Sequence, residues 1–229
     1  MHLANQQSIQ INGIDMKELY INDVLLWQAQ LSRIPAEYQE VEYIGRAANT
    51  TTTYIDLGFA FDTAATMYIG YERMSTDSQW FGAAENSGKY RCMITEGNGV
   101  LAYGAGSSVY ITASLPNRDG YRYFKYILKP GMMEFEDIEN GDYSNNHNNI
   151  EFTMTSNLAL LGQHYNGAYR ATGSMHIYSF KYYDKTDKLI CDLVPCYRKS
   201  DGEIGVYDIV RKMFLTNGGT GKLVKGADV

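Results

Sequence analysis

Cysteine is scarce in this sequence, which carries only Cys92, Cys191 and Cys196 among its 229 residues. An odd and small number of cysteines argues against a disulfide framework and indicates folding in a reducing cytosol. Cys191 and Cys196 lie five positions apart, so on a continuous strand their side chains point to opposite faces, about 16 Å apart. Without a bend at Pro195 neither a disulfide nor a shared metal ion joins them, and we expect the thiols to be small core residues.

A basic excess and a long apolar run are also missing. With 20 basic and 26 acidic residues the formal net charge is -6, which excludes the basic surface that nucleic-acid binding requires. No segment approaches the roughly 20 apolar residues of a membrane-spanning helix. The start, MHLANQQSIQ, has neither the basic nor the apolar region of a secretory signal. We therefore expect a protein made in the cytosol that binds no nucleic acid and inserts into no membrane.

Neither a fixed-period repeat nor a Gly-X-Y run occurs, which excludes a long fibrous shaft. Helical periodicity is equally hard to find, although residues 208–213 are compatible with one helical turn. The chain has aromatic residues and glycine instead: 20 tyrosines, eight phenylalanines and two tryptophans accompany 22 glycines and four prolines. Aromatic side chains fit the pleated surface of a strand and glycine fits tight turns, so this composition predicts an all-β fold.

Residues 8–28, SIQINGIDMKELYINDVLLWQ, read as three short strands. Asn-Gly and Asn-Asp pairs separate the apolar runs at the spacing of successive hairpins. So small a unit buries little apolar surface alone, and its apolar side chains need either the main domain or another protein to rest on. We divide the chain into an N-terminal β-hairpin docking module, residues 1–33, and a main domain, residues 34–229. The residues predicted to dock on a partner are Leu19, Ile21, Leu25, Leu26 and Trp27.

From residue 34 onward, short apolar and aromatic runs alternate with Gly, Asn and Asp, beginning with YQEVEYIG and TTTTYIDLGFAF. A dozen or more short strands without a convincing helix are typical of an antiparallel jelly-roll β-sandwich. Further strands are predicted at residues 67–71, 80–84, 90–95, 100–103, 109–112, 121–128, 132–138, 150–153, 158–162, 174–183, 188–197, 204–208, 213–216 and 222–224.

The stretch PCYRKSDGEIGVYDIVRKMF carries most of the charge of the C-terminal third. Arg198, Lys199, Asp201 and Glu203 lie around a Lys-Ser-Asp-Gly sequence, in which an Asp or Ser side chain can bond the backbone and Gly202 takes the unusual dihedral angle. Charged clusters at hairpin tips are usually solvated. We therefore interpret this stretch as strands joined by a turn, and not as a catalytic strip.

Several segments resemble a known family. IPAEYQEVEYIG and TYIDLGF, followed later by MHIYSFKYYD, LICDLVPCYRKSDGEIGVYDIV and FLTNGGTGKLVKG, resemble a concanavalin A-like, laminin-G-like sandwich domain. Such domains occur in structural and tail-associated proteins of phages and prophages of Gram-positive gut bacteria, and in some bacterial surface proteins. The resemblance covers residues 34–226, with its ends more specific than its middle. IDMKELYINDVLLWQ resembles the short hairpin module with which many phage tail and virion proteins begin.

The resemblance implies a phage virion structural protein, associated with a tail tip, baseplate or fibre, that is assembled in the host cytoplasm and released by lysis. Its sandwich would face outward and present a surface for host-cell or glycan binding. Its hairpin module would dock on other virion proteins, and a homo-oligomer is expected because virion appendages are symmetric. Two alternatives stay open: a polysaccharide-degrading glycoside hydrolase of sandwich fold, and a capsid or tail decoration protein that binds no sugar.

Glycan binding requires aromatic faces that stack on sugar rings and nearby polar groups that bond to hydroxyls. The segment QHYNGAYRATG provides both kinds of group in what reads as a turn, and the middle of the chain adds further aromatic residues. A tyrosine-rich sandwich also buries many of its tyrosines, so a core role is the competing interpretation. The candidate ligand-binding residues are Trp80, Tyr103, Tyr110, Tyr165, Asn166, Tyr169 and Arg170.

Paired carboxylates are the usual machinery of glycoside hydrolysis. In MEFEDIEN, Glu134 and Glu136 alternate onto one face of a strand. Sandwich-fold glucanases arrange their acids as Glu-x-Asp-x-Glu, whereas here Asp137 and Glu139 follow and place the third acid on the wrong face. We therefore expect an acidic solvent-facing surface beside a turn, DIENGDY, with no catalytic residues and no enzymatic activity.

Metal binding is weakly indicated. The four histidines are scattered, and none has a second ligand at the spacing of a zinc site. Sandwich domains of the resembling family sometimes carry calcium in a loop rich in oxygen ligands, which DYSNNHNN can supply. A flexible loop without metal is the competing interpretation, and no other cofactor is expected. The calcium candidates are Asp142, Asn145 and Asn146.

Overall fold

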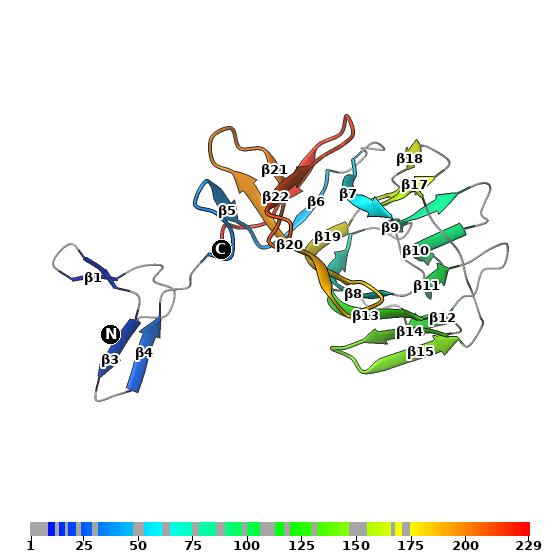
Figure 1. The fold of residues 1–229 in the computed structure, drawn as a ribbon, viewed down its shortest axis with the longest axis horizontal. Helices are drawn as coiled ribbons and strands as arrows, with labels where there is room; N and C mark the ends of the chain where they lie inside the picture. Colours follow the sequence, from blue (N-terminus) through cyan, green and yellow to red (C-terminus); the bar gives the residue numbers. More distant parts are fainter. Residues whose placement is uncertain are drawn as a thin grey trace.

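The computed structural model of the chain describes residues 9–11, 14–16, 18–21, 24–28, 32–47, 53–60, 65–74, 78–85, 90–97, 100–105, 113–116, 120–129, 132–146, 155–165, 168–170 and 175–229. Every regular element in these residues is a β-strand (Figure 1). Within these ranges no helix has the length and apolar character needed to cross a bilayer. The prediction of an all-β fold is confirmed.

One of the two large sheets, sheet I, follows the strand order β12-β11-β10-β9-β16-β7. Strand β17 pairs in parallel with β9, and β18 pairs with β17, while the other pairings are antiparallel. The strands of sheet I are β7 (Ile55–Ala60), β9 (Ser78–Glu85), β10 (Tyr90–Gly97), β11 (Val100–Ala105), β12 (Ala113–Pro116), β16 (Asn157–Leu160), β17 (Gln163–Tyr165) and β18 (Ala168–Arg170).

The other large sheet, sheet II, follows the order β15-β14-β13-β8-β19-β20-β21-β22, with β5 beside β20 and with β6 between β19 and β23. Its strands pair antiparallel. They are β5 (Tyr38–Glu40), β6 (Ile44–Arg46), β8 (Ala65–Arg73), β13 (Tyr121–Lys129), β14 (Met132–Asp137), β15 (Asp142–Asn146), β19 (Met175–Tyr183), β20 (Leu189–Arg198), β21 (Ile204–Asp208), β22 (Met213–Thr216) and β23 (Leu223–Lys225).

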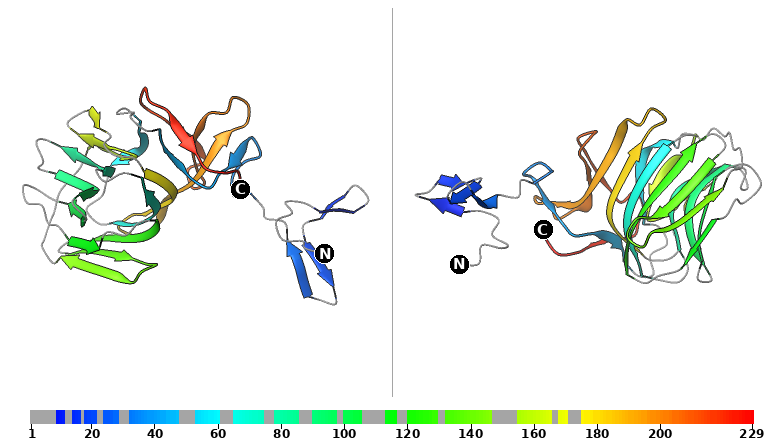
Figure 2. Two further views of the ribbon diagram at one scale, coloured as in Figure 1. Left: turned by 180° about the vertical axis from the view of Figure 1, so that it is seen from behind. Right: turned by 90° about the horizontal axis from the view of Figure 1, so that it is seen from below.

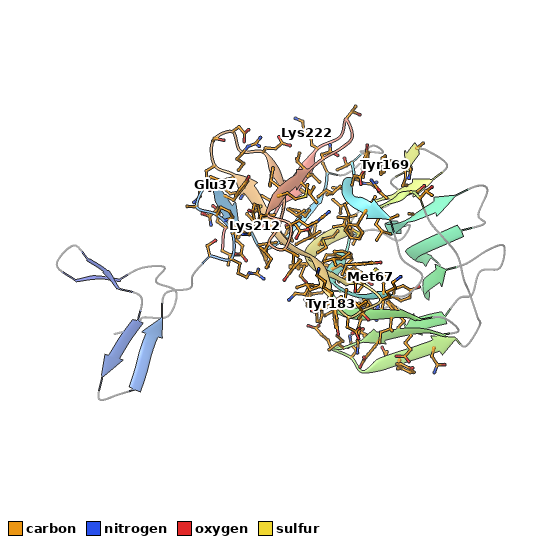
Figure 3. The ribbon with its side chains drawn as sticks, viewed as in Figure 1. Glu37, Met67, Tyr169, Tyr183, Lys212 and Lys222 are labelled. Atoms are coloured by element: carbon orange, nitrogen blue, oxygen red, sulfur yellow. The ribbon has the colours of Figure 1, made fainter. Side chains whose placement is uncertain are left out.

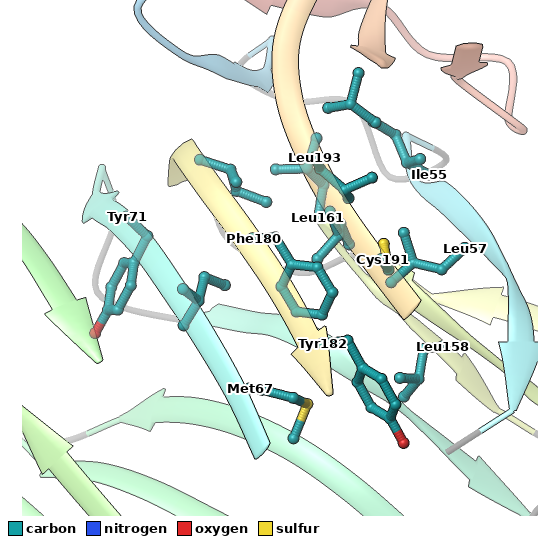
Figure 4. Packing of buried hydrophobic residues seen from close by; sticks show 14 of the residues in the cluster. Ile55, Leu57, Met67, Tyr71, Leu158, Leu161, Phe180, Tyr182, Cys191 and Leu193 are labelled. Carbon is teal, nitrogen blue, oxygen red and sulfur yellow. The ribbon is translucent and has the colours of Figure 1, made fainter. Parts of the chain in front are cut away.

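The two large sheets pack face to face and enclose the main core (Figure 2). On the strands whose side chains the structure describes, alternate residues point inward, as the two-residue period of a strand requires. The described buried core residues of sheet I are aliphatic, whereas sheet II contributes aromatic side chains and methionine together with further aliphatic ones (Figure 4). The fully buried members include Ile55, Leu57, Leu158 and Leu160 of sheet I and Met67, Ile69, Tyr71, Phe124, Phe135, Phe180 and Tyr182 of sheet II.

A second, smaller core lies on the other side of β20 and β21. Ile34, Val194, Cys196 and Tyr207 form it, and the Tyr38 ring lies 5.1 Å from the Tyr207 ring. Residues 34–38 therefore cover the C-terminal strands from outside. The two cores divide the cysteines of β20, because Cys191 belongs to the main core while Cys196 belongs to the second. Both thiols are free and buried, which confirms the expectation for these two.

The turn at the end of β20 is also confirmed. Arg198 pairs with Asp201, whose Oδ1 accepts a hydrogen bond from the Glu203 backbone N–H. Gly202 has a φ of 73°, the left-handed region that glycine adopts without strain. The Lys199 ammonium donates to the Ala36 carbonyl at 2.9 Å. The charged stretch thus closes a hairpin and holds the segment that covers the second core.

Three expectations need correction or fall outside the described residues. Residues 209–212 form a β-turn and not a helical turn, because the Asp208 carboxylate accepts the N–H groups of Val210 and Arg211 and Lys212 has a positive φ of 56°. The N-terminal region has four strands where three were expected, since β1 pairs with β2 and β3 pairs with β4 in separate hairpins. The strands predicted at 109–112 and 150–153 lie outside the described residues.

The four N-terminal strands are β1 (Ile9–Ile11), β2 (Ile14–Met16), β3 (Glu18–Ile21) and β4 (Val24–Gln28). Each hairpin is a two-stranded sheet of its own, and neither joins sheet I or sheet II among the described residues (Figure 1). The division of the chain at residue 33 stays a prediction.

A buried ion pair ties β13 to the turn after β14. The Arg122 guanidinium donates to Asp137 Oδ2 from Nε at 2.9 Å and from Nη2 at 2.6 Å, and both side chains are buried. Asp137 Oδ1 accepts the N–H groups of Glu139 and Asn140. Burial alone would raise the pKa of Asp137, but the hydrogen bonds from Arg122 and Asn140 outweigh it and hold the pKa below its ordinary value.

We expect Asp137→Asn to lower the free energy of unfolding by about 3–5 kcal/mol, because it removes the carboxylate that pairs with the buried Arg122 charge. The double variant Arg122→Met with Asp137→Asn removes that charge and keeps an oxygen for the turn, so most of the loss should be recovered. Urea unfolding at pH 7 measures both variants.

The pH dependence of the stability difference between wild type and Asp137→Asn tests whether the ionised Asp137 carboxylate is its cause. A carboxylate whose folded pKa is depressed stabilises the protein above its unfolded pKa of about 3.9, and this contribution is lost as pH falls through the folded pKa. The gap between wild type and Asp137→Asn should therefore shrink below about pH 4. A gap that is unchanged down to pH 2.5 would contradict the assignment.

Candidate functional site

The outer side of sheet II carries tyrosines. On β8, β13 and β19 the residues between the buried positions point away from sheet I, because side chains alternate along a strand. Six tyrosines lie on or beside this side, and none of them is buried. Figure 3 labels Tyr183, which ends β19. We call this surface the tyrosine face; its tyrosines are Tyr43, Tyr68, Tyr121, Tyr123, Tyr178 and Tyr183.

One half of the tyrosine face is centred on Tyr68. Its ring centroid lies 6.1 Å from that of Tyr123 and 5.9 Å from that of Tyr183. The strand register places Tyr68 between Lys125 of β13 and Lys181 of β19. Continuing outward, Glu136 stands opposite Lys125 and Asp192 stands opposite Lys181. Charges of both signs therefore flank the Tyr68 ring in one row across five strands.

The other half is centred on Tyr178. Its ring lies edge-on to Tyr121 at 4.9 Å, and its hydroxyl donates to Glu72 Oε2 at 2.9 Å. Burial, together with this hydrogen bond, raises the pKa of Tyr178 well above its ordinary value. Tyr43 stacks on His176 at 3.7 Å, and the His176 Nδ1 lies 3.5 Å from the same Glu72 oxygen. Glu72 thus contacts both the Tyr178 hydroxyl and the His176 ring in this half.

Gly70 lies between the two halves, and its lack of a side chain leaves space for the Tyr121 hydroxyl. The register places Gly70 between Tyr123 and Ser179. A Cβ atom at Gly70 would lie 2.7 Å from Ser179 Oγ and 2.8 Å from the Tyr121 hydroxyl, so only glycine allows the Tyr121 hydroxyl to lie over β8. The result is a shallow strip in which aromatic rings alternate with hydroxyl, carboxylate and ammonium groups.

Such a strip has the chemistry of a sugar-binding surface. Rings present apolar faces and edges to the C–H groups of a sugar, while carboxylate and ammonium groups accept from and donate to its hydroxyls. Tyr121 and Tyr143, which lies opposite Glu136 on β15, are 40% and 53% exposed, so part of the aromatic surface is open. The arrangement fits an extended chain lying across the strands better than a small ligand in a deep pocket.

The sequence singled out Tyr169, and the structure places it in a second aromatic group at the edge of sheet I (Figure 3). Its ring stacks on Tyr54 at 3.6 Å and lies 4.6 Å from His164. Its hydroxyl donates to Asp56 Oδ2 at 2.5 Å. Burial, together with this hydrogen bond, raises the pKa of Tyr169 well above its ordinary value. Asp56 Oδ1 accepts the N–H of Gly58.

This edge group also holds the loop after β22. The Tyr54 N–H donates to Asn217 Oδ1 at 3.1 Å, and the Tyr54 hydroxyl donates to the Gly218 carbonyl at 2.8 Å. Gly218 lies so close that a Cβ atom there would be 2.6 Å from Tyr54 Cε2. Tyr169 is therefore enclosed between two rings, and its contacts anchor the β17-β18 hairpin. Its predicted role in ligand binding stays a prediction.

The other predicted ligand residues are spread over sheet I. Tyr165 and Arg170 lie on the same β17-β18 hairpin as Tyr169, whereas Trp80 lies in β9 and Tyr103 in β11, separated by β10. The side chains of these four residues lie outside the described structure. Tyr110 and Asn166 lie entirely outside the described residues. Of the predicted docking residues, Leu19 and Ile21 lie in β3 and Leu25, Leu26 and Trp27 lie in β4, again without described side chains.

The calcium candidates lie in a strand and not in a loop. Residues 142–146 form β15, which pairs with β14. Because side chains alternate, Asp142 and Asn145 occupy opposite sides of β15 and do not converge. The side chain of Asn146 lies outside the described structure. In the part of the chain that the structure describes, no three His, Cys, Asp or Glu side chains gather as a metal site would require.

The acid pair of β14 is placed as expected. Glu134 and Glu136 share the outer side of β14, and Glu139 lies in the exposed turn that follows. Asp137, in contrast, points inward to Arg122. The register sets Glu134 opposite Ile127 and Asn145, and Glu136 opposite Lys125 and Tyr143. Neither carboxylate faces a second acid across a gap.

Sequence reasoning missed the tyrosine face, although a signal for it exists. Residues 67–71 and 175–183 alternate buried positions with Tyr68, Tyr178 and Tyr183, as does YRYFKYILK. Each segment was identified as a strand. That these segments are neighbours in one sheet, and so place their outward tyrosines together, follows only from the pairing.

We expect Tyr169→Phe to lower the free energy of unfolding by about 1–2 kcal/mol, because it keeps the ring stack and removes the hydrogen bond to the Asp56 carboxylate. Tyr54→Phe, which loses a bond to a neutral carbonyl only, is the matched control and should cost less. Unchanged stability together with lost glycan binding in Tyr169→Phe would overturn the anchoring role.

Comparisons with known proteins give likenesses of fold. Mouse laminin α1 chain domains LG4-5 superpose with a TM-score of 0.54 and 8% sequence identity, covering 96% of this chain and 53% of that chain. Tailspike protein 2 of an Escherichia coli O157:H7 bacteriophage gives a TM-score of 0.39 and 12% identity over 68% of this chain and 26% of that chain. The enzymatically active domain of the same tailspike protein gives a TM-score of 0.40, with 12% identity over 68% of this chain and 30% of that chain.

The chain thus spans about half the length of the laminin fragment (53%) and less than a third of each tailspike chain (26% and 30%). No protein-family model matches the sequence, and no curated protein matches it. The laminin likeness shows that this chain has a laminin-G-like β-sandwich fold, as the resemblance implied. The attribution to phages of Gram-positive gut bacteria and the identity of the hairpin module stay predictions.

Proposed function

We propose that this chain is a phage virion structural protein whose sandwich binds a glycan of the host surface through the tyrosine face. The observation that supports the proposal is the gathering of six tyrosines, with charged groups of both signs between them, on the outer side of sheet II. Location in a tail tip, baseplate or fibre follows from the sequence resemblance only.

Other ligand classes fit the face less well. Nucleic acid needs a basic surface, whereas Glu72, Glu136 and Asp192 outnumber Lys125 and Lys181 in the two halves. A stable protein partner favours a contiguous apolar patch, whereas here charged residues flank the groups of tyrosine rings. Stacking contacts combined with polar groups at the ring edges suit a polymer of hydroxyl-bearing rings.

Hydrolysis of the bound polymer is the alternative function, and one observation favours it: Glu134 and Glu136 share the tyrosine-face side of sheet II. We propose binding without hydrolysis, because Glu136 lies opposite Lys125 and no second acid stands across from either residue. Hydrolysing enzymes place their two carboxyl groups on either side of the scissile bond.

We expect the full chain to bind at least one bacterial cell-wall or mucin sugar on a glycan array, and Tyr68→Ala and Tyr121→Ala each to weaken that binding about 5- to 30-fold. The loss of a ring that stacks on a sugar accounts for about 1–2 kcal/mol. Met213→Ala, which removes an exposed apolar side chain from β22, is the control and should bind as wild type does.

Two results would oppose the proposal, one from the glycan array and one from an assay for released reducing sugar. An array without signal favours a decoration protein that binds no sugar. Release of reducing sugar that disappears in the Glu134→Gln, Glu136→Gln double variant favours the glycoside hydrolase.

The N-terminal hairpins are proposed to dock the sandwich on another virion protein, with the assembly a homo-oligomer. Among the residues that the structure describes, neither hairpin pairs with the large sheets, so removing residues 1–30 should leave the sandwich folded by circular dichroism. We expect the truncated chain to be absent from purified particles. Incorporation at the wild-type level would contradict the docking role.

A further inference from the structure

We propose that Asp192 is a specificity-determining residue of the tyrosine face and that the ligand is an uncharged, hydroxyl-rich polysaccharide. In this role Asp192 Oδ1 accepts a hydrogen bond from a sugar hydroxyl, and Lys181 donates to an adjacent oxygen of the same sugar. The inference rests on the proposed glycan binding and names the chemistry that selects the glycan.

The backbone fixes Asp192 firmly. Its N–H donates to Asp208 Oδ1 at 3.3 Å, and its carbonyl accepts the Ile209 N–H at 3.0 Å. Its side chain is 7% exposed, and Oδ2 lies 3.4 Å from the Lys181 ammonium. Oδ1, in contrast, has no hydrogen-bond partner.

Among the buried carboxylates of the described residues, that oxygen differs from the others. A buried polar atom without a partner costs about 1–3 kcal/mol, and more when it is charged. Asp137 and Asp208, the other buried carboxylates of the described residues, use both of their oxygens. Asp192 Oδ1 is the one buried carboxylate oxygen in the described ranges without a donor. A donor brought by a ligand would remove this penalty.

The free oxygen borders the Tyr68 half of the tyrosine face. Asp192, Lys181 and Tyr68 are consecutive members of one cross-strand row. Burial raises the pKa of Tyr123, and the neighbouring Tyr121, Tyr68, Tyr183 and Asp192 raise it further, which is consistent with Asp192 lying near these rings.

Access to Oδ1 depends on Lys181. The oxygen is closed to solvent, whereas the Lys181 side chain is 37% exposed and has a flexible four-carbon stem. The proposal requires that this stem rotates when the ligand binds, so that the carboxylate becomes accessible while the ammonium, 3.4 Å from Oδ2 in the free protein, still reaches the ligand. A sugar with neighbouring hydroxyl groups can then bond to both residues.

The surrounding charges select against charged ligands. A cationic group would meet the Lys181 ammonium, which already neutralises Asp192. An acidic polymer would meet Asp192, Glu72 and Glu136 on a chain with a net charge of -6. An uncharged polyol avoids both repulsions and still provides the donor that Oδ1 lacks.

The experiment is affinity electrophoresis of the full chain in gels that contain either a neutral polysaccharide (dextran, mannan or galactan) or an acidic one (polygalacturonate or hyaluronate). We expect wild type to be retarded by at least one neutral polymer and by neither acidic one. Asp192→Asn should weaken that retardation about tenfold or more, as for a charged hydrogen-bonding group. Asp187→Asn, at an exposed turn position, is the matched control and should not change it.

The outcomes separate this inference from the proposed function. If no polymer retards wild type, the glycan-binding function fails. If wild type and Asp192→Asn are retarded equally while Tyr68→Ala is not retarded, the function stands and the role of Asp192 is wrong. Retardation by the acidic polymers alone overturns the assignment of an uncharged ligand. If thermal unfolding shows Asp192→Asn to be misfolded, Lys181→Gln decides: weaker retardation supports the subsite, and unchanged retardation contradicts it.

Discussion

The two-residue period of the β-strand governs both sides of sheet II. On β8, β13 and β19 one set of alternating residues fills the core against sheet I, with Tyr71, Phe124 and Phe180 among the buried rings. The same period necessarily sends the intervening residues outward, where they meet the outward residues of neighbouring strands. A shift of register by one residue would bury the lysines of the outer row and expose the aromatic core. The core therefore fixes the composition and the geometry of the tyrosine face.

The edge of sheet I and the outer side of sheet II differ in how their polar groups are bonded. At the edge of sheet I, Tyr54, Asp56 and Tyr169 satisfy one another and the loop after β22, so this group closes the fold. On the outer side of sheet II the rings are only partly covered, and Asp192 keeps an unused oxygen. Buried polar groups with hydrogen-bond partners stabilise the sandwich, and the unpartnered Asp192 oxygen is the one at which we propose that a ligand donates.

Local patterns predicted the fold well. Alternation and turn residues located β8 to β11, β13, β14, β16 and β19 to β23 but missed β12, β15, β17 and β18. The Lys-Ser-Asp-Gly turn was predicted to need Gly202, which has a positive φ. The site was predicted poorly, because Tyr68, Lys181 and Asp192 come from three separate segments that only strand pairing unites. Asp137 was assigned to a solvent-facing acidic surface because no local pattern shows that Arg122, fifteen residues earlier, reaches it in the core.

Radical footprinting of tyrosine side chains tests the central claim most directly. Oxidation of Tyr68, Tyr121, Tyr123 and Tyr183 is measured by mass spectrometry with and without a bound neutral polysaccharide. If the outer side of sheet II is the binding face, the glycan protects these tyrosines and leaves Tyr54 and Tyr169 unchanged. Protection confined to Tyr165 and Tyr169 at the edge of sheet I, with the tyrosine face oxidised as in the free protein, would contradict the account.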